Sequence, residues 1–216
     1  MDKTFLLFDL DGTLTDPFEG IKNSFRHAFE KTGMNIPVDD GLRWVIGPPL
    51  RESIKRLGVP EERGEEILTA FREYFVPTGL YENRPYDGIE RLLRDLRNKG
   101  HVLALATSKV KEYAEKVLER FKLAEYFSFV GGAELDGSRS EKAEVIKYVM
   151  ENLKISGKDG VYIIGDREHD VKGAKKTGIK SVGVLWGYGD EQELTNAGAD
   201  YIIRDMDGLR ELFNAG

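Results

Sequence analysis

Short apolar runs alternate with helix-like patterns along most of the chain. The runs are continuously apolar and rich in Val, Ile and Phe, which is typical of strands covered on both faces. They lie at residues 4–8, 102–106, 126–130, 161–164, 181–185 and 201–203. Between them, apolar positions recur about every three to four residues, which predicts amphipathic helices over 89–96, 110–121 and 146–153. This alternation predicts an α/β fold, a Rossmann-like doubly wound parallel sheet with helices on both faces.

A long stretch after the first predicted strand lacks any strand-like run. Its apolar side chains form three stripes with helical spacing, at 21–29, 50–57 and 67–75. We therefore expect an α-helical cap domain inserted after the first strand. The predicted boundaries are 17–80 for the cap, and 1–16 with 81–216 for the core. Tracts of Pro, Gly and polar residues at 16–17 and 77–79 are expected to link the two parts. A lid over a site is the functional interpretation of the insert, and an insert without function is the alternative.

The composition is that of an ordinary globular protein, and it excludes several kinds of chemistry. The 216 residues are 40% apolar, and 32 Lys and Arg stand against 38 Asp and Glu, a formal net charge of −6. The absence of cysteine excludes disulfides, cysteine-bound zinc and a thiol nucleophile. Net acidity disfavours nucleic acid as a partner, because binding its backbone requires clustered Lys and Arg. The N-terminal apolar run is too short for a signal peptide or a membrane span, so we expect a cytoplasmic protein without membrane partners.

Polar side chains follow three of the predicted strands, at the edge where open parallel sheets bind ligands. The three segments are Asp9-Leu10-Asp11-Gly12-Thr13, Thr107-Ser108-Lys109 and Gly165-Asp166-Arg167-Glu168-His169-Asp170. Four carboxylates, those of Asp9, Asp11, Asp166 and Asp170, are therefore expected to converge. Carboxylates brought so close repel one another unless a cation compensates them. Oxygen ligands without a His or Cys cluster favour a hard ion, so we predict a Mg²⁺ cofactor.

Lys142 is an independent candidate for binding an anion. Ser140 is expected to cap the helix over 146–153, which puts Lys142 in its first turn, where the helix dipole disfavours a cation. A cation is stable there beside an anion, and free backbone N–H groups at a helix start also bind phosphate. Taken alone, each feature has a structural alternative: Asp11-Gly12 as a turn, Thr107-Ser108 as a helix cap, Lys142 as a solvated side chain. Their joint occurrence in this order favours the functional interpretation.

These residues resemble, in order, the four sequence motifs of the haloacid dehalogenase (HAD) superfamily. The motifs are matched by Asp9-Leu10-Asp11-Gly12-Thr13-Leu14, by Thr107-Ser108, by Lys142, and by Gly165-Asp166 with Asp170. The resemblance covers essentially the whole chain and includes a helical cap inserted after the first motif. It implies a HAD-like hydrolase in which an aspartate of the protein receives the phosphoryl group of the substrate.

The resemblance implies a role for each matching residue. Asp9 is expected to be the nucleophile that forms an aspartyl-phosphate, and Asp11 the general acid and then base. The residues expected to contact the phosphoryl group are Thr107, Ser108, Lys142 and Gly12. The implied Mg²⁺ ligands are Asp9, Asp11 through its backbone carbonyl, Asp166 and, directly or as an orienting residue, Asp170. Because the second aspartate of the first motif is present, dehalogenation is not expected, since breaking a carbon–halogen bond needs no proton donor.

Within the superfamily, the chain is similar to phosphoglycolate phosphatase-like enzymes, and among them to those described as 5′-nucleotidase-like. The residues behind this likeness lie at 44–50, 107–109, 136–139, 165–170 and 186–189. It implies a Mg²⁺-dependent phosphatase that acts on a small phosphorylated metabolite, as a monomer or homodimer. Arg43 and Arg51 flank a Gly-Pro-Pro turn in the cap and are candidates for binding a second carboxylate or phosphate, or else are solvated arginines. A phosphomutase of the β-phosphoglucomutase type, a pyrophosphatase and a non-catalytic binding or regulatory module are the alternatives.

Overall fold

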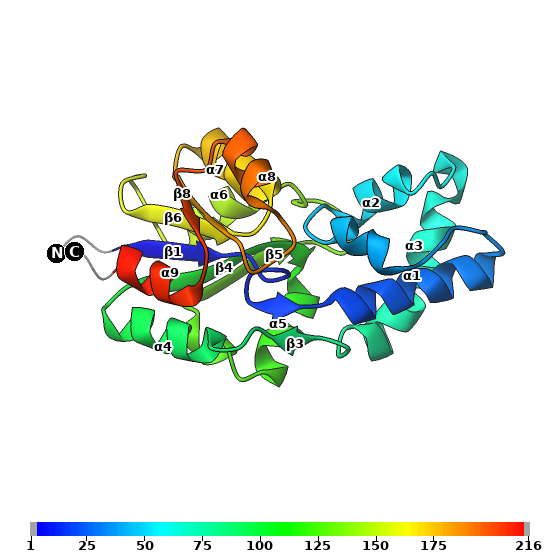
Figure 1. The fold of residues 1–216 in the computed structure, drawn as a ribbon, viewed down its shortest axis with the longest axis horizontal. Coiled ribbons are helices and arrows are strands. Elements are labelled where there is room, and N and C mark those ends of the chain that lie inside the picture. Colours follow the sequence, from blue (N-terminus) through cyan, green and yellow to red (C-terminus); the bar gives the residue numbers. More distant parts are fainter. Residues whose placement is uncertain (1–3, 214–216) are drawn as a thin grey trace.

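A parallel six-stranded sheet forms the centre of the computed structural model, which describes residues 4–213 (Figure 1). Its strands, in spatial order, are β5 (Phe129–Ala133), β4 (Val102–Val110), β1 (Phe5–Phe8), β6 (Val161–Gly165), β7 (Lys180–Val184) and β8 (Tyr201–Ile203). Every neighbouring pair is parallel. The chain extends from β1 to one side through β4 and β5 and to the other through β6, β7 and β8, so the strand order reverses beside β1. The predicted doubly wound α/β fold is confirmed.

Helices cover both faces of the sheet and are held there by apolar side chains. One layer contains α4 (Ile89–Asn98), α5 (Lys111–Arg120) and α9 (Met206–Leu212), and the other contains α6 (Lys142–Asn152) and α7 (Glu168–Thr177), with α8 (Glu191–Ala197) packed on α7. In β1, Leu6 and Phe8 belong to the first apolar layer and Leu7 to the second. Burial on both faces explains why the strand runs are continuously apolar. Within residues 4–213, no helix combines the length and the apolar character needed to cross a bilayer.

The strand predicted at 126–130 starts later than expected. The beginning of that run forms a short 3₁₀ helix, η4 (Ala124–Tyr126), whose tyrosine is buried in the core. The strand then continues through Gly131, where a Cβ would lie 2.3 Å from Val149 Cγ2 of α6. A glycine inside a strand often marks such a close approach. The apolar pattern therefore placed the strand about three residues too early, because the buried part of β5 consists of Gly131, Gly132 and Ala133, two of which have no apolar side chain.

A helical segment is inserted between β1 and α4 and lies at the right of Figure 1. Its elements are α1 (Phe18–Thr32), η1 (Asp40–Val45), α2 (Leu50–Arg56), η2 (Glu61–Arg63), α3 (Gly64–Tyr74) and the π-helical turn η3 (Phe75–Gly79). Its interior is aromatic: ring centroids of Phe25 and Phe71 lie 4.9 Å apart, and those of Phe71 and Phe75 5.3 Å apart. Phe75 also packs on Tyr113 of α5 at 5.8 Å. The boundaries of a cap domain at 17–80 remain a prediction.

Two short antiparallel strands connect this helical insert to the sheet. β2 (Thr15–Asp16) pairs with β3 (Arg84–Pro85), and the Arg84 guanidinium lies 2.9 Å from the Asp16 carboxylate. The link expected at 77–79 is instead helical, and Gly79 there packs against Gly20 of α1. The second crossing between the insert and the sheet therefore comes after η3, at β3.

Gly20→Ala is expected to destabilise the helical insert. The new Cβ would lie 1.8 Å from the carbonyl oxygen of Gly79, a backbone atom that cannot rotate away, and overpacking costs about 1–3 kcal/mol. Gly64→Ala is the matched control, because its Cβ meets open space and its backbone is already helical. It should stabilise α3 by roughly 0.5–1 kcal/mol. Urea unfolding measures both free energies, and equal values for the two variants would contradict the contact between Gly20 and Gly79.

Candidate active site

Three adjacent strands bring predicted site residues to one edge of the sheet. Asp9 follows β1, Thr107 lies in β4 and Asp166 follows β6, with β1 between the other two strands. The pairing of β4 with β5 shifts register between Ala106 and Val110, so Thr107 lies at an irregularity of its strand. The exposed fractions of Asp9, Thr107 and Asp166 are only 3%, 2% and 0%. Open parallel sheets bind ligands at this edge.

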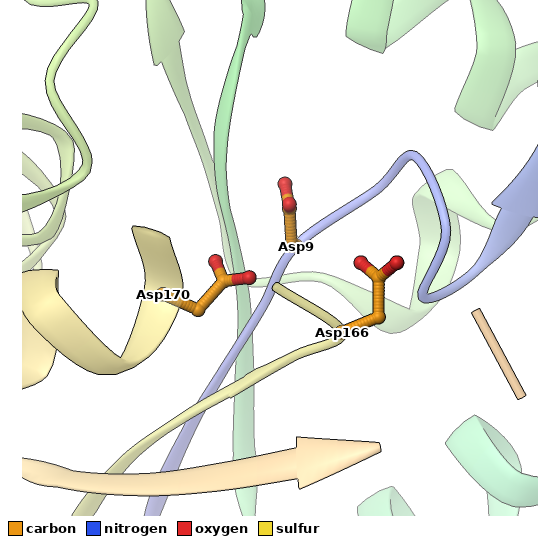
Figure 2. Close-up of side chains that lie close together, drawn as sticks. All are labelled: Asp9, Asp166 and Asp170. Carbon is orange, nitrogen blue, oxygen red and sulfur yellow. The ribbon is translucent and has the colours of Figure 1, made fainter. Parts of the chain in front are cut away.

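Three buried carboxylates lie close together at this edge, and one lysine contacts two of them. Asp9, Asp166 and Asp170 each present an oxygen within 4.8 Å of the others, and Figure 2 shows the three side chains together, coming from the ends of β1 and β6 and from α7. Lys142, the first residue of α6, places Nζ 2.9 Å from Asp9 Oδ1 and 2.8 Å from Asp170 Oδ1. It also donates a hydrogen bond to the carbonyl oxygen of Ala106 at 3.0 Å. The fold thus brings these four charged residues together.

The start of α6 differs in one detail from the sequence prediction. Its N-cap is Glu141, without a capping side-chain hydrogen bond, and not Ser140. Lys142 is nevertheless in the first turn, as predicted. Its stem packs on Gly173 of α7, where a Cβ would lie 2.7 Å from Lys142 Cγ. The missing side chain at Gly173 therefore leaves room for the lysine to pass between the two helices and reach the carboxylates.

The charges within this cluster do not balance. Burial raises the pKa of Asp166 to about 8, and the neighbouring Asp170 adds to the rise. Burial also raises the pKa of Asp170, although Lys142 opposes it. For Lys142, burial alone would lower the pKa, but Asp170 and Asp9 outweigh it and the net shift is upward. One ammonium group faces three carboxylates, so a further cation would stabilise the ionised cluster.

The donor atoms of the cluster fit a hard divalent cation. All three are carboxylate oxygens of buried residues, and among residues 4–213 no histidine joins the group. Oxygen donors of this kind suit Mg²⁺ better than they suit a soft metal. The side chains that would hold such an ion are Asp9, Asp166 and Asp170. The Asp11 side chain is not part of the group, and its contact through the backbone carbonyl remains a prediction.

Asp11 is paired instead with a lysine to which the sequence analysis assigned no role. Lys109 Nζ lies 2.5 Å from Asp11 Oδ2, and the lysine side chain is only 7% exposed. Burial raises the pKa of Asp11, and Lys109 partly offsets that rise. Lys109 Nζ also lies 5.3 Å from the ring centroid of Phe75 in the helical insert. The sequence showed a cation two residues after Thr107, but only the fold shows which carboxylate it contacts.

Neighbouring segments hold both oxygens of the Asp166 carboxylate. The backbone N–H of Tyr188 donates to Oδ2 at 2.7 Å, and the Thr13 hydroxyl donates to Oδ1 at 3.3 Å. Gly12 has a φ of +85° and packs against the same group, since a Cβ there would lie 2.2 Å from Oδ2. Gly12 therefore adjoins the acidic cluster, and its contact with phosphate remains a prediction. The sequence could not predict this contact of Tyr188, because a backbone N–H is present in almost every residue and leaves no trace in the pattern of side chains.

A cavity of about 160 Å³ opens beside the cluster, between the sheet edge and the helical insert. Its polar lining includes Asp9, Asp11, Thr107, Ser108 and Lys109. Its apolar lining includes Ile21, Leu68, Phe71, Phe75, Val110 and Tyr113. The cavity thus combines a charged end, where the motif residues lie, with an aromatic wall contributed mainly by the insert.

The two arginines singled out in the cap lie in different places. Arg51 lines the cavity and pairs with a glutamate of α3. Arg43 is not among the cavity residues of the described chain, and its guanidinium lies over the rings of Phe18 and Tyr188, at 5.2 and 4.8 Å. Arg72 of α3, which the sequence analysis did not single out, lines the cavity beside Arg51. A substrate contact by Arg51 stays a prediction, and the position of Arg43 favours a packing role.

Comparison with known proteins agrees with this geometry. The family model described as haloacid dehalogenase-like hydrolase matches residues 6–184. A 5′-nucleotidase from Pseudomonas aeruginosa is 39% identical over 211 residues, which cover 97% of this chain and 95% of that protein. Tyrosine-protein kinase PtkA from Mycobacterium tuberculosis is 41% identical over 208 residues, 95% of this chain and 71% of that protein. The crystal structure of "a predicted phosphatase from Clostridium acetobutylicum" has a TM-score of 0.93 and 42% identity, with 98% of both chains covered.

The chain therefore belongs to the haloacid dehalogenase-like hydrolase family, and within it to the enzymes that hydrolyse phosphoric monoesters. The resemblance inferred from the four motifs is confirmed. Among its relatives, one is named a 5′-nucleotidase and another a phosphoglycolate phosphatase. Since the buried aspartate cluster suits a metal ion, the composition of the site agrees with the family assignment.

Asp166→Asn is expected to change how the stability of the metal-free protein depends on pH. The pKa of Asp166 in the folded protein, about 8, lies above its ordinary value of 3.8, so the folded state holds this proton more tightly than the unfolded state. The free energy of unfolding therefore falls as pH rises between those two values. The asparagine variant lacks this contribution and should have the higher Tm at about pH 8.5, where 1 kcal/mol corresponds to roughly 2–4 °C.

At the same pH, Mg²⁺ should make the Tm of the original protein higher than that of Asp166→Asn. Binding to the folded state raises the Tm of the original protein, whereas the asparagine variant, which lacks one carboxylate, gains little. Thermal unfolding with Mg²⁺ and with a chelator measures both effects, with Asp159→Asn at an exposed position as the matched control. An equal rise in Tm for all three proteins would show that the ion binds elsewhere.

Proposed function

We propose that this protein is a Mg²⁺-dependent phosphatase that hydrolyses a small phosphate monoester through a phosphorylated Asp9. The observation that supports it most directly is the position of Lys142, which contacts both Asp170 and Asp9, a residue of the cavity lining. A phosphate dianion approaches a carboxylate only if positive charge offsets their repulsion. Lys142 carries one such charge, and Mg²⁺ held by the aspartates would supply the rest.

In this proposal Asp9 attacks the phosphorus atom. Its Oδ1 accepts a hydrogen bond from the backbone N–H of Leu10 at 2.8 Å and lies 2.9 Å from Lys142 Nζ. Both contacts fall on Oδ1, so Oδ2 is the atom that forms the bond to phosphorus while the bond to the leaving oxygen breaks. Thr107 and Ser108 line the same cavity, and their hydroxyl groups donate to the phosphoryl oxygens as charge develops on them.

Asp11 transfers the proton in both steps. Burial raises its pKa, which favours the protonated form that a departing alkoxide needs. Once ionised, the carboxylate accepts a proton from the water that attacks the phosphorylated aspartate, and Lys109 at 2.5 Å stabilises the anion in between. The proton given to the leaving group is thus recovered from water, and each turnover returns both aspartates to their starting state.

The wall of the cavity favours a nucleoside 5′-monophosphate as the substrate. Phe71, Phe75 and Tyr113 offer aromatic surface to a flat base, and aromatic pairs contribute about 0.5–1.5 kcal/mol beyond the burial of area. Phosphoglycolate and pyrophosphate have no apolar part that could pack against this wall. The Pseudomonas relative, named a 5′-nucleotidase, supports the same class of substrate.

Two other activities share the first chemical step and differ in the final acceptor. A phosphomutase excludes water and passes the phosphoryl group to a sugar phosphate. The name of the mycobacterial relative, a tyrosine-protein kinase, raises transfer to a protein hydroxyl. Analysis of the products separates these cases, since hydrolysis yields one inorganic phosphate for each alcohol released. Label retained on a sugar phosphate or a tyrosine peptide would instead indicate transfer.

Asp9→Asn is expected to lower kcat for phosphate release by at least about 10³-fold, because an amide is a poor nucleophile; this factor corresponds to about 4 kcal/mol. Asp11→Asn should lower kcat by about 10²-fold or more with alkyl phosphates. The loss should be smaller with p-nitrophenyl phosphate, whose leaving group departs without a proton. Assays of inorganic phosphate with Mg²⁺ and with a chelator measure these losses, and Asp159→Asn is the control. Undiminished release by Asp9→Asn would exclude the covalent mechanism.

Nucleoside 5′-monophosphates should be better substrates than ribose 5-phosphate, which has the same phosphorylated sugar and no base. We expect a ratio of kcat/KM of at least about tenfold, equivalent to about 1.4 kcal/mol of contact between base and wall. Phosphoglycolate and pyrophosphate should rank below both. Equal values for AMP and ribose 5-phosphate would show that the aromatic wall does not bind the base.

A further inference from the structure

Arg167 directly follows Asp166 in the chain and is buried at the boundary between the core and the helical insert. Its side chain is only 9% exposed. Its backbone N–H donates to Asp170 Oδ2 at 3.3 Å. Arg167 is therefore next to both Asp166 and Asp170 of the acidic cluster. Nothing in the proposed chemistry uses the guanidinium, which turns toward the insert.

The guanidinium binds backbone carbonyl groups of the insert. Arg167 Nη1 donates to the carbonyl oxygens of Ile46 and, at 3.4 Å, of Trp44. Gly47, at φ +106°, packs on the same side chain, since a Cβ there would lie 2.7 Å from Arg167 Cγ. We name residues 44–47 the cap segment. Three of its four residues therefore contact one arginine of the core.

Glu193 of α8 holds the arginine from the other side. Glu193 Oε1 accepts hydrogen bonds from Arg167 Nε and from the backbone N–H of Glu168, both at 2.8 Å. The carboxylate is thereby tied to the first turn of α7, and the guanidinium is compensated within the core. Since a buried charge must keep its partners, this pair stays with the core, and the carbonyl groups of the cap segment are the contacts that separate if the insert moves.

The cap segment forms part of the cavity. Val45, Ile46 and Gly47 line it together with the motif residues Asp9 and Thr107. Arg167 does not line the cavity in the described chain, so it affects a substrate only through that segment. Displacing the segment would therefore change how a substrate fits the cavity without removing any reacting group.

We infer that Arg167 is a positioning residue that fastens the cap segment to the core beside Asp166 and so sets the part of the cavity that receives the base of the leaving nucleoside. The expected effect on KM rests on the proposed function, whereas the attachment of the cap segment to Arg167 does not. Binding of the leaving group and alignment of the acidic cluster are thereby linked through adjacent residues of one loop.

Kinetics give the first test. Arg167→Met removes both hydrogen-bond donors but keeps an apolar stem of similar length, and we expect KM for AMP to rise about tenfold while kcat and the KM for ribose 5-phosphate change little. Arg167→Lys keeps the charge and should recover part of the loss. Arg204→Met, which removes an exposed arginine paired with Glu191 of α8, is the matched control and should match the original protein. A merely structural role would raise both KM values together.

Fluorescence gives a second test that needs no catalysis. The chain has two tryptophans, so Trp186→Phe leaves Trp44 of the cap segment as the only one. In that background, Arg167→Met should raise the acrylamide quenching constant of Trp44 at least about twofold, as local opening exposes the ring. Glu193→Gln should produce a smaller rise, and Arg204→Met none. Circular dichroism confirms that each variant is folded.

The two tests separate the inference from the proposed function. If no phosphate ester is hydrolysed by the original protein, the phosphatase proposal fails, while a rise in Trp44 quenching still supports the fastening of the cap segment. If the protein hydrolyses AMP but folded Arg167→Met changes neither the quenching of Trp44 nor KM for AMP, Arg167 does not position the segment and the inference is overturned.

Discussion

The neutralisation of three buried carboxylates is the constraint on which the rest of this structure depends. Asp9, Asp166 and Asp170 come from two strand ends and a helix, and Lys142 is the cation that contacts two of them. Burying such a group without compensation costs several kcal/mol. The lysine reaches them because α6 starts at this edge of the sheet and Gly173 leaves space for its stem. The site therefore depends on the close packing of α6 and α7 at Gly173.

Residues after β7 connect the acidic cluster to β2, the short strand that leads into the helical insert. Tyr188 donates its backbone N–H to Asp166, and its hydroxyl binds Asp16 in β2, the strand that leads into the insert. Trp186 donates its ring N–H to the carbonyl oxygen of Thr13 at 2.9 Å. The loop after β7 therefore contacts both the acidic cluster and the base of the insert, and Arg167 adds a contact to the cap segment. Contacts between the core and the insert are therefore concentrated next to the acidic cluster.

The cavity shows why the chemistry of this protein was easier to predict than its substrate. The charged end consists of residues that follow strands, and strand ends of a parallel sheet always meet at one edge. The apolar wall comes from α1, α3, η3 and α5, and its shape depends on how these helices lie over the sheet. Arg43 and Arg51 looked equivalent in the sequence, yet Arg51 lines the cavity while Arg43 stacks on two rings. No local pattern distinguishes them.

The sequence by itself determined the order of the six strands of the sheet, helices α4, α5 and α6, the helical character of the insert, the strand-end aspartates and the lysine at the start of α6. These features follow from short-range periodicity and from residues adjacent in the chain. Tertiary structure decided where β5 starts, that Lys109 pairs with Asp11, and that Arg167 donates hydrogen bonds to the cap segment. Each joins groups distant in sequence, and its geometry depends on how whole elements pack. Local propensity carries no information about such contacts until the chain has folded.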